Sequence, residues 1–223
     1  MDEYILHLEA EFQNNANRNI SVGQKAYMRG QFEFFGIKTP LRRKIQKPFL
    51  VKQFLPSKEK VMLLVKELWE KPEREYQFFA QELVFKYVKE FEESDIELFE
   101  FMIIHKSWWD TVDFIAVKLV GSYLKKYPHK KEFYVDKWLR SNNIWLQRTA
   151  IIFQLKYKTE VDTGLLEKSI QFLLNSKEFF INKAIGWMLR EYSKTDPVWV
   201  KELVNRTALA NLSRREALRL MRD

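Results

Sequence analysis

The sequence contains no cysteine and only three histidines among its 223 residues, which excludes several kinds of site at the outset. Without cysteine there is no disulfide, no thiolate metal ligand and no cysteine nucleophile. His7, His105 and His129 are scattered without the spacing of metal ligands, which indicates ordinary surface or core roles for them. We therefore expect neither a metal nor any other cofactor.

Long hydrophobic runs are also missing from the sequence. Charged residues interrupt every apolar segment before it reaches about 18 residues, the length at which a membrane-spanning helix becomes a candidate. The opening segment, MDEYILHLEAEF, is acidic and lacks the basic region of a signal peptide. We expect a cytoplasmic protein that has no membrane partner.

Glycine and proline are scarce, at six each, and apolar residues recur at intervals of three and four through most of the chain. This spacing is typical of amphipathic helices, and no segment has the alternation and turn residues of a β-hairpin. The sequence therefore predicts an all-α protein. The helical segments include KEKVMLLVKELWE, YQFFAQELVFKYVKEF, DFIAVKLVGSYLKKY, NIWLQRTAIIFQLKY and FINKAIGWMLREY.

A small residue repeats within successive predicted helices, at intervals of 36, 34, 34 and 33 residues. The repeating residues are Ala80, Ala116, Ala150, Ala184 and Ala217. A period near 35 residues with two helices in each repeat is the signature of an α-solenoid, in which neighbouring helix pairs bury one another's apolar faces. We predict a monomer with one domain over residues 1–223, a curved superhelix of about six HEAT-like helix pairs.

Positive charge is concentrated in the C-terminal part of the chain. The net charge is +8, and residues 137–223 contain 16 Lys and Arg against 9 Asp and Glu, whereas the first 136 residues are close to neutral. A basic half-molecule suggests a polyanionic partner, and nucleic acid is favoured over membrane because no Lys-rich amphipathic anchor stands apart from the fold. In a solenoid, the basic repeats would line a positively charged concave cleft.

The segment SWWDTVD combines two tryptophans with two aspartates. Ser107 is predicted to cap a helix, and Asp110 is placed to complete a capping box. Trp109 and Asp113 are four residues apart, so the indole and the carboxylate share one helix face while Trp108 points into the core. That shared face is either a binding wall or a contact between repeats beside a solvated carboxylate.

Two later helices combine cations with aromatic residues. Arg148 and Lys156 fall on one predicted helix face, and Lys183, Trp187 and Arg190 form a stripe on the next. Cations bind phosphates and flat rings bind sugar or base, so such faces suit a nucleic-acid groove. The alternatives are a solvated or ion-paired surface arginine at position 148 and core packing at position 187. The recurrence of such faces in three successive repeats favours nucleic-acid binding.

Four segments, QFEFFGIKTPLRRKI, SWWDTVDFIA, LQRTAIIFQL and FINKAIGWMLREYSKTDP, closely resemble those of the bacterial DNA alkylation repair glycosylases usually called AlkD. The resemblance runs in order over essentially the whole chain. It implies a HEAT-like superhelix that holds double-stranded DNA in its cleft. It also implies a monofunctional glycosylase that removes cationic N3- and N7-alkylated purines without flipping the base.

The resemblance also assigns roles to residues of this sequence. It implies a catalytic trio of Trp109, Asp113 and Trp187, with Arg148 as the principal contact to the DNA backbone. It also implies Arg190 and Lys156 as further DNA contacts. Asp113 would stabilise the sugar cation that develops during cleavage and would orient water, and an ordinary aspartate, with a pKa of about 4, is ionised for both tasks at neutral pH.

The N-terminal region gives less specific signals. Thr39 followed by Pro40 predicts the start of a helix, with Thr39 as the N-cap. Arg42 and Arg43 in the first turns either bind the opposite DNA strand or are solvated. Tyr27 stands where the resemblance places a residue near the duplex.

Two other classes of function stay open at this point. One is a DNA-binding relative that keeps the fold without catalysis, and the other is a protein-binding solenoid whose basic trough accepts an acidic peptide. The presence of Asp113 together with both tryptophans and Arg148 favours the enzyme. Salt-sensitive binding to duplex DNA separates the nucleic-acid classes from the protein-binding class, and base release separates enzyme from binder.

Overall fold

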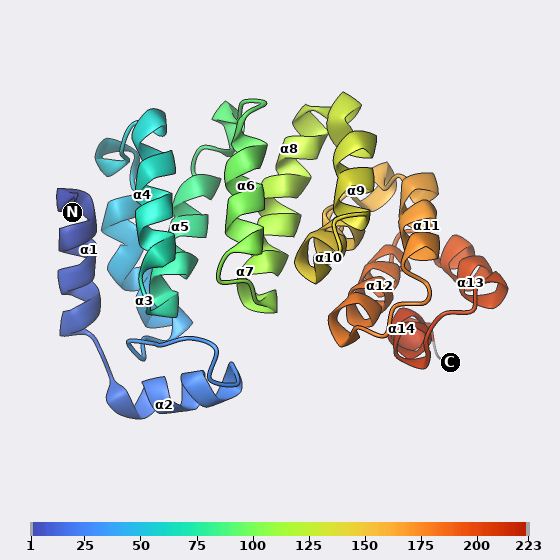
Figure 1. The fold of residues 1–223 in the computed structure, drawn as a ribbon, viewed down its shortest axis with the longest axis horizontal. Helices are drawn as coiled ribbons and strands as arrows, with labels where there is room; N and C mark the ends of the chain where they lie inside the picture. The colour runs from blue at the N-terminus through green and yellow to red at the C-terminus, as the bar shows by residue number, and fades with distance from the viewer. Residues whose placement is uncertain (1, 222–223) are drawn as a thin grey trace. The chain divides into compact units, whose positions relative to one another are not determined.

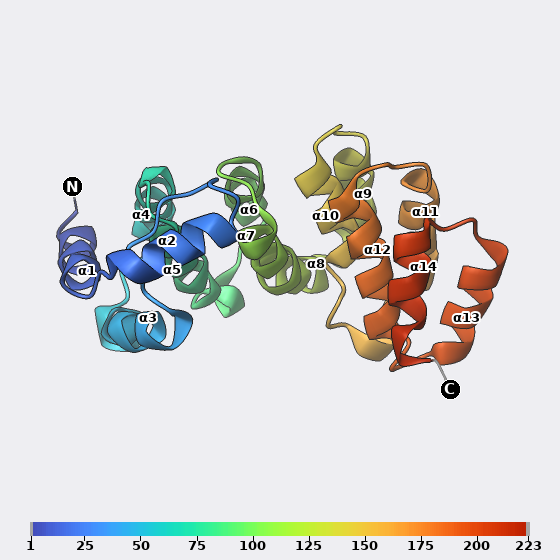
Figure 2. The same cartoon turned by 90° about the horizontal axis from the view of Figure 1, so that it is seen from below.

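The computed structural model describes residues 2–221, which form helices and turns apart from one isolated bridge between Glu33 and Glu73. The chain divides into two compact units, residues 1–91 and 92–223. Figures 1 and 2 show the helices of each unit in chain order. The all-α prediction is confirmed, whereas a single domain over residues 1–223 stays a prediction. Among the helices described, none is long and apolar enough to cross a membrane.

The first unit contains a pair of packed helices and a more irregular N-terminal part. Its α-helices are α1 (Glu3–Asn14), α2 (Arg18–Tyr27), α3 (Thr39–Gln46), α4 (Lys58–Glu70) and α5 (Arg74–Phe85). Helix α4 packs against α5, and α1 packs against α3. Helix α2 runs crosswise to α1 and α4 in Figure 1, and none of its side chains is buried.

The loop between α2 and α3 is held by a buried carboxylate. Glu75, at the start of α5, is fully buried and accepts the backbone N–H groups of Phe35, Gly36 and Ile37, each at 3.1 Å. Gly36 has a φ of +89°, and a Cβ there would collide with the backbone of Asn17. Burial raises the pKa of the Glu75 carboxyl, and these backbone hydrogen bonds oppose the rise. The path of the chain after α2 therefore depends on α5.

The second unit is a stack of helix pairs. Its α-helices are α6 (Asp95–Ile104), α7 (Trp109–Phe114), α8 (Gly121–Lys126), α9 (Lys131–Leu139), α10 (Ile144–Ile152), α11 (Thr163–Phe172), α12 (Phe179–Tyr192), α13 (Pro197–Arg206) and α14 (Asn211–Ala217). A π-helical turn, Ile115–Val120, joins α7 to α8 as one continuous helix. This long helix, α10, α12 and α14 pack in that order. Helix α6 packs against the long helix, α9 against α10, and α13 against α12 and α14, whereas α11 packs against α9 and α10.

The alanines of the predicted repeat all lie in the cores of the two units. Each is at most 1% exposed, and they lie in α5, the π-helical turn, α10, α12 and α14, the second helices of successive pairs. Neighbouring second helices approach closely, and a Cβ at Gly186 of α12 would lie 2.6 Å from the Cβ of Glu216 in α14. The HEAT-like pairing predicted from the repeat is confirmed.

The predicted cap at the SWWDTVD segment is wrong. Helix α7 begins at Trp109 and no side chain caps it. The Ser107 hydroxyl instead donates to the carbonyl of Ile103, 2.6 Å away, at the end of α6. Asp110 accepts the N–H of its neighbour Thr111 at 2.9 Å. Ser107 does not cap α7 because Trp108 occupies the N-cap position, so the helix begins one residue later than predicted.

The predicted start of α3 is displaced by one residue. Lys38 occupies the N-cap position without a side-chain hydrogen bond, and Thr39 is the first helical residue. Pro40 follows in the first turn, where its missing N–H group has no helical partner to lose. The fixed φ of proline therefore sets this helix start, and the threonine hydroxyl does not.

Candidate functional site

A cavity of about 260 Å³ opens among helices α7, α10 and α12 of the second unit. We call it the Asp113 pocket. Its lining residues are Trp109, Asp113, Arg148, Phe179, Phe180, Lys183, Trp187 and Arg190. Six of these residues come from the sequence-based site, and they lie on three successive second helices as the repeat predicted. The catalytic assignment of the trio stays a prediction.

An ion pair with two parallel hydrogen bonds forms one side of the pocket. The Arg148 Nε donates to Asp113 Oδ1 at 2.7 Å, and Nη2 donates to Oδ2 at 2.8 Å. Nη1 donates to the carbonyl of Phe180 at 2.6 Å. Such a fork fixes the plane of the carboxylate as well as its position. Asp113 is thus oriented by α10 and, through Arg148, by the first turn of α12.

The sequence left two surface alternatives open, a solvated or ion-paired surface arginine at position 148 and a solvated carboxylate at Asp113, and both are wrong. The Arg148 side chain is only 4% exposed, so it is neither a solvated nor a surface-paired arginine. Asp113 is 19% exposed, and its carboxylate is paired rather than solvated. Trp187 is partly exposed at the pocket wall, and its ring centroid lies 6.0 Å from the guanidinium carbon of Arg148. The aromatic face of Trp187 therefore lies toward a cation and lines the pocket, outside the core.

The environment of Asp113 differs from that of an ordinary aspartate. Burial raises the pKa of its carboxyl, and the hydrogen bonds and charge of Arg148 oppose that rise. The nearby carboxylate of Asp110 adds to it. The expectation of an unshifted pKa is therefore wrong, because the residue lies on a helix face that a neighbouring repeat covers.

The two cations of α12 share a carboxylate from the last helix. Lys183 pairs with Glu216 of α14 at 2.9 Å, and Arg190 donates to the other oxygen of the same carboxylate. The hydrogen bond from Lys183 holds the pKa of Glu216 below its ordinary value. The positive charge of Lys183 and Arg190 is therefore partly balanced by Glu216, which does not line the pocket.

Aromatic residues at the start of α12 complete the pocket wall, and the sequence analysis did not select them. Phe179 is 58% exposed, and Phe180 packs against Trp145 and Trp108 with ring centroids 4.9 and 5.2 Å away. Trp108 is therefore part of an aromatic cluster behind the pocket and is only partly buried. The adjacent pair of phenylalanines at a helix start was a usable signal.

Lys156 does not share a face with Arg148. Helix α10 ends at Ile152, and the following turn carries Lys156 to a separate cavity of about 340 Å³. There it pairs with Glu191 at 2.8 Å. The predicted four-residue spacing failed because the chain leaves the helix at Phe153. Its contact with DNA stays a prediction.

The N-terminal candidates lie in the first unit. Tyr27 is 71% exposed and lines a cavity of about 540 Å³ beside α2. The two arginines of α3 differ: Arg42 is buried and pairs with Glu82 at 3.0 Å, whereas the side chain of Arg43 is 66% exposed and reaches the same carboxylate only at 3.9 Å. Arg42 is therefore structural, and Arg43 is available to a partner.

A second basic region was missed by the charge count over the first 136 residues. Residues 12–58 contain ten Lys and Arg and a single acidic residue, Glu33. Acidic residues on either side of this segment cancelled its charge in the longer window. Several of its cations are exposed and have no ion-pair partner among residues 2–221. These cations are Arg18, Arg29, Lys38, Lys44 and Lys47.

Comparison with known proteins gives a consistent assignment. A family described as DNA alkylation repair enzyme matches residues 8–221. The chain belongs to this family. A solved structure described as a predicted DNA alkylation repair enzyme from Enterococcus faecalis is similar, with 35% sequence identity and a TM-score of 0.85. The similarity covers 91% of this chain and 95% of that one. A search of curated proteins finds no match.

The family match covers both compact units. It includes the Asp113 pocket of the second unit and all of the basic segment 12–58 of the first. Membership in the DNA alkylation repair enzyme family therefore concerns both regions. The resemblance drawn from the four sequence segments is confirmed at the level of the family.

Proposed function

We propose that the protein is a monofunctional DNA glycosylase that removes cationic N3- and N7-alkylated purines from double-stranded DNA. The observation that carries the proposal is the Asp113 carboxylate, held by Arg148 in a pocket whose walls include Trp109 and Trp187. Alkylation at N3 or N7 makes the purine a cation and a good leaving group. The reaction then needs stabilisation of the sugar and a water molecule, without a general acid.

Asp113 supplies the negative charge in this proposal. Cleavage of the glycosidic bond develops positive charge at C1′ of the deoxyribose, and a fixed carboxylate beside it stabilises the transition state electrostatically. The same carboxylate orients the attacking water and accepts its proton. The fork from Arg148 maintains the orientation of the charge before substrate binds, so little reorganisation is needed.

The aromatic walls favour contact with the sugar. Trp109 and Trp187 present electron-rich faces to sugar C–H bonds that become more positive in the transition state. The pocket volume, about 260 Å³, lies below the range of about 300–1,000 Å³ that is typical for sites enclosing a whole small-molecule ligand. This supports a reaction in which the alkylated base is not extruded into the protein.

Cations contribute binding to the DNA backbone. Arg148 uses three of its five N–H groups on Asp113 and Phe180, which leaves two for a phosphate. Lys183 and Arg190 lie at the same pocket. Arg43 and Tyr27 in the first unit and Lys156 beyond α10 are further contacts in this proposal. Phosphate contacts of this kind fix the register of a protein on the duplex.

The decisive experiment measures single-turnover release of 7-methylguanine from a defined duplex. We expect release by the wild-type protein and a rate at least about 10-fold lower for Asp113→Asn, which is over about 1.4 kcal/mol of transition-state stabilisation. Binding to the duplex is expected to persist in the variant, because asparagine removes the charge and keeps the shape.

Asp136→Asn is the matched control for this experiment. The Asp136 side chain is 42% exposed on α9, pairs with Arg140 at the C-cap of that helix and lines no part of the Asp113 pocket. Its variant is expected to release base at the wild-type rate. Tight duplex binding without base release by the wild-type protein would make this chain a non-catalytic DNA-binding relative. Absence of salt-sensitive duplex binding would favour the protein-binding solenoid.

A further inference from the structure

The helix that carries Asp113 changes its winding two residues after Asp113, at Ile115. The π-helical turn Ile115–Val120 follows α7, and α8 continues from Gly121 without a break in the helical backbone. Such turns accommodate one extra residue, are rare, and often occur at functional sites. One residue of an α-helix corresponds to a rotation of about 100°. The turn therefore rotates Asp113 relative to α8 by a large angle.

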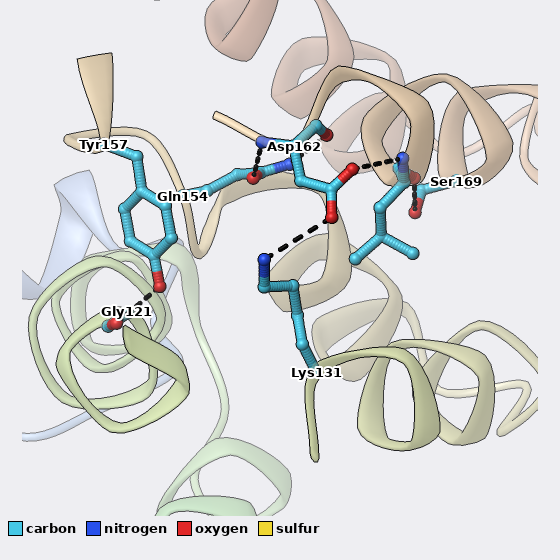
Figure 3. A network of polar contacts seen from close by, with 7 residues as sticks. Gly121, Lys131, Gln154, Tyr157, Asp162 and Ser169 are labelled. Carbon is cyan, nitrogen blue, oxygen red and sulfur yellow. Dashed lines mark hydrogen bonds and ion pairs between the residues drawn. The ribbon is translucent and has the colours of Figure 1, made fainter. Parts of the chain in front are cut away.

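The first residue of α8, Gly121, is locked to the end of α10. A Cβ at Gly121 would lie 2.6 Å from the carbonyl oxygen of Phe153, closer than real Cβ atoms approach an oxygen. Tyr157 donates its buried hydroxyl to the Gly121 carbonyl at 2.6 Å, as Figure 3 shows. Its ring packs edge-on against Phe153 and lies 4.5 Å from the ammonium nitrogen of Lys125 in α8.

The turn that presents Phe153 and Tyr157 is itself fixed. Gln154, which is fully buried, donates to the Asp162 carbonyl at 3.2 Å and accepts the Asp162 N–H at 2.9 Å. The Asp162 carboxylate accepts from Leu165 N–H and from Lys131 of α9 (Figure 3). The turn after α10 is therefore a firm support for α8.

Two contacts thus join the same pair of helices. The Asp113–Arg148 ion pair lies before the π-helical turn, and the contact of Gly121 with Phe153 and Tyr157 lies directly after it. If an uninterrupted α-helix joined the two contacts, Asp113 would be rotated away from Arg148 when Gly121 contacts Phe153 and Tyr157. The π-helical turn is what allows both contacts at once.

We propose that Gly121 and Tyr157 are positioning residues, which act through the π-helical turn to hold Asp113 against Arg148 at the pocket. Neither residue lines the pocket. Any side chain at position 121 meets a backbone carbonyl that cannot rotate aside, so α8 is pushed from α10. The displacement is transmitted along the rigid helix to Asp113. The importance of the contact for base release rests on the glycosylase proposal above.

The test compares Gly121→Ala and Tyr157→Phe with the wild-type protein in two measurements. The first is the exchange protection of the Arg148 Nε–H in arginine-selective ¹⁵N NMR, which reports the ion pair without any substrate. The second is single-turnover release of 7-methylguanine at saturating protein. For Gly121→Ala we expect loss of protection of the Arg148 Nε–H and a rate of base release at least about 10-fold lower.

For Tyr157→Phe, which removes one hydroxyl, we expect weaker protection and a rate about threefold lower. Duplex affinity is expected to change by less than about twofold in both, because a positioning defect affects the reaction step rather than phosphate contacts.

Gly164→Ala is the matched control, because a Cβ at Gly164 would meet its nearest atom at an ordinary 3.8 Å. It should behave as wild type in both measurements. Wild-type protection and rate in a folded Gly121→Ala variant would overturn the proposal. If that variant does not fold, unchanged protection and rate in Tyr157→Phe overturn it instead. Absence of base release by the wild type would refute the glycosylase function, and the NMR comparison would still decide the positioning role.

Discussion

The positive charge of the Asp113 pocket differs in kind from that of residues 12–58. In the pocket, Arg148, Lys183 and Arg190 each pair with a carboxylate, and Arg148 is nearly inaccessible to solvent. In residues 12–58, cations such as Lys38 and Lys44 are exposed and have no ion-pair partner among residues 2–221.

This difference separates two functions of a cation. A buried, paired arginine orients its carboxylate at short range and is little affected by salt. An exposed, unpaired lysine attracts a polyanion over about a Debye length and loses its effect as salt rises. We therefore expect changes at the buried Asp113–Arg148 pair to act mainly on the rate of base release, and changes in residues 12–58 to act mainly on affinity.

The largest effect is expected for Arg148→Met, which removes the charge and keeps much of the side-chain volume. We expect the single-turnover rate of base release to fall about 100-fold, close to 2.7 kcal/mol, because the carboxylate loses its orientation. Urea unfolding should show a loss of about 3 kcal/mol, because a buried charge is left without its partner.

Arg140→Met is the control for that variant. Arg140 is exposed and pairs with Asp136 one helical turn away, so its loss is expected to cost less than about 0.5 kcal/mol. A wild-type rate in Arg148→Met would show that Asp113 needs no partner, and the distinction between paired and unpaired cations would lose its kinetic meaning.

The next largest effect is expected for the triple variant Lys38→Ala, Lys44→Ala and Lys47→Ala. Its dissociation constant for duplex DNA should rise about 10-fold at 0.1 M salt, and the slope of log affinity against log salt should fall by about 2.7 if each lysine contacts one phosphate. The rate at saturating protein should be unchanged. Fluorescence anisotropy over a salt series measures both binding quantities.

A matched triple variant removes the same charge from the second unit. This variant carries Lys168→Ala, Lys177→Ala and Lys201→Ala. The three lysines are exposed and line no part of the Asp113 pocket. We expect a smaller change of the salt slope for this variant than for the first. Equal slopes for the two variants would mean that affinity depends on net charge alone and that residues 12–58 have no special part in it.

Glu216→Gln is expected to have a smaller effect, on stability. The wild-type pKa of Glu216 is lowered in the folded state, so its ion pairs contribute stability above the ordinary carboxyl pKa and lose it as pH falls through the folded value. We expect a loss of about 1 kcal/mol at pH 7 that disappears at low pH. Urea unfolding across pH measures the difference, and Glu160→Gln, at an exposed pair, serves as the control.

The smallest expected effect is a shift in the pH dependence of base release. Base release requires ionised Asp113, and burial raises the pKa of this carboxyl, so the acid limb of the single-turnover rate should lie above pH 3.8. In Arg148→Met the opposing hydrogen bond is lost, and the limb should move to still higher pH. A limb at or below the ordinary value, after subtraction of spontaneous release, would contradict the role of Asp113.

The fold was predictable because a small residue recurs at a regular interval along the sequence. Ala150 and Ala184 recur at the helix contact of each pair, and apolar periodicity marks the helices around them. The face shared by Trp109 and Asp113 follows from a four-residue spacing within one helix. Local periodicity carries that information, and no knowledge of neighbouring repeats is needed.

Other features depend on tertiary contacts that no local pattern records. The pairing of Asp113 with Arg148 joins residues 35 positions apart, and the sharing of Glu216 by two cations of α12 depends on the approach of α14. Helix ends were less predictable for a similar reason. Lys156 left its expected face because α10 stops at Ile152, within an apolar sequence that gives no stop signal.

The buried carboxylate of Glu75 also determines the order in which the first unit can assemble and open. Helix α2 buries no side chain, and a ten-residue helix is too short to persist alone in water. The loop after α2 is held in place by hydrogen bonds from its own backbone amides to the Glu75 carboxylate. Because Glu75 belongs to α5, these bonds can form only once α5 is in place. Helix α2 should therefore form after α5 during folding, and its amides should exchange with solvent long before those of α5.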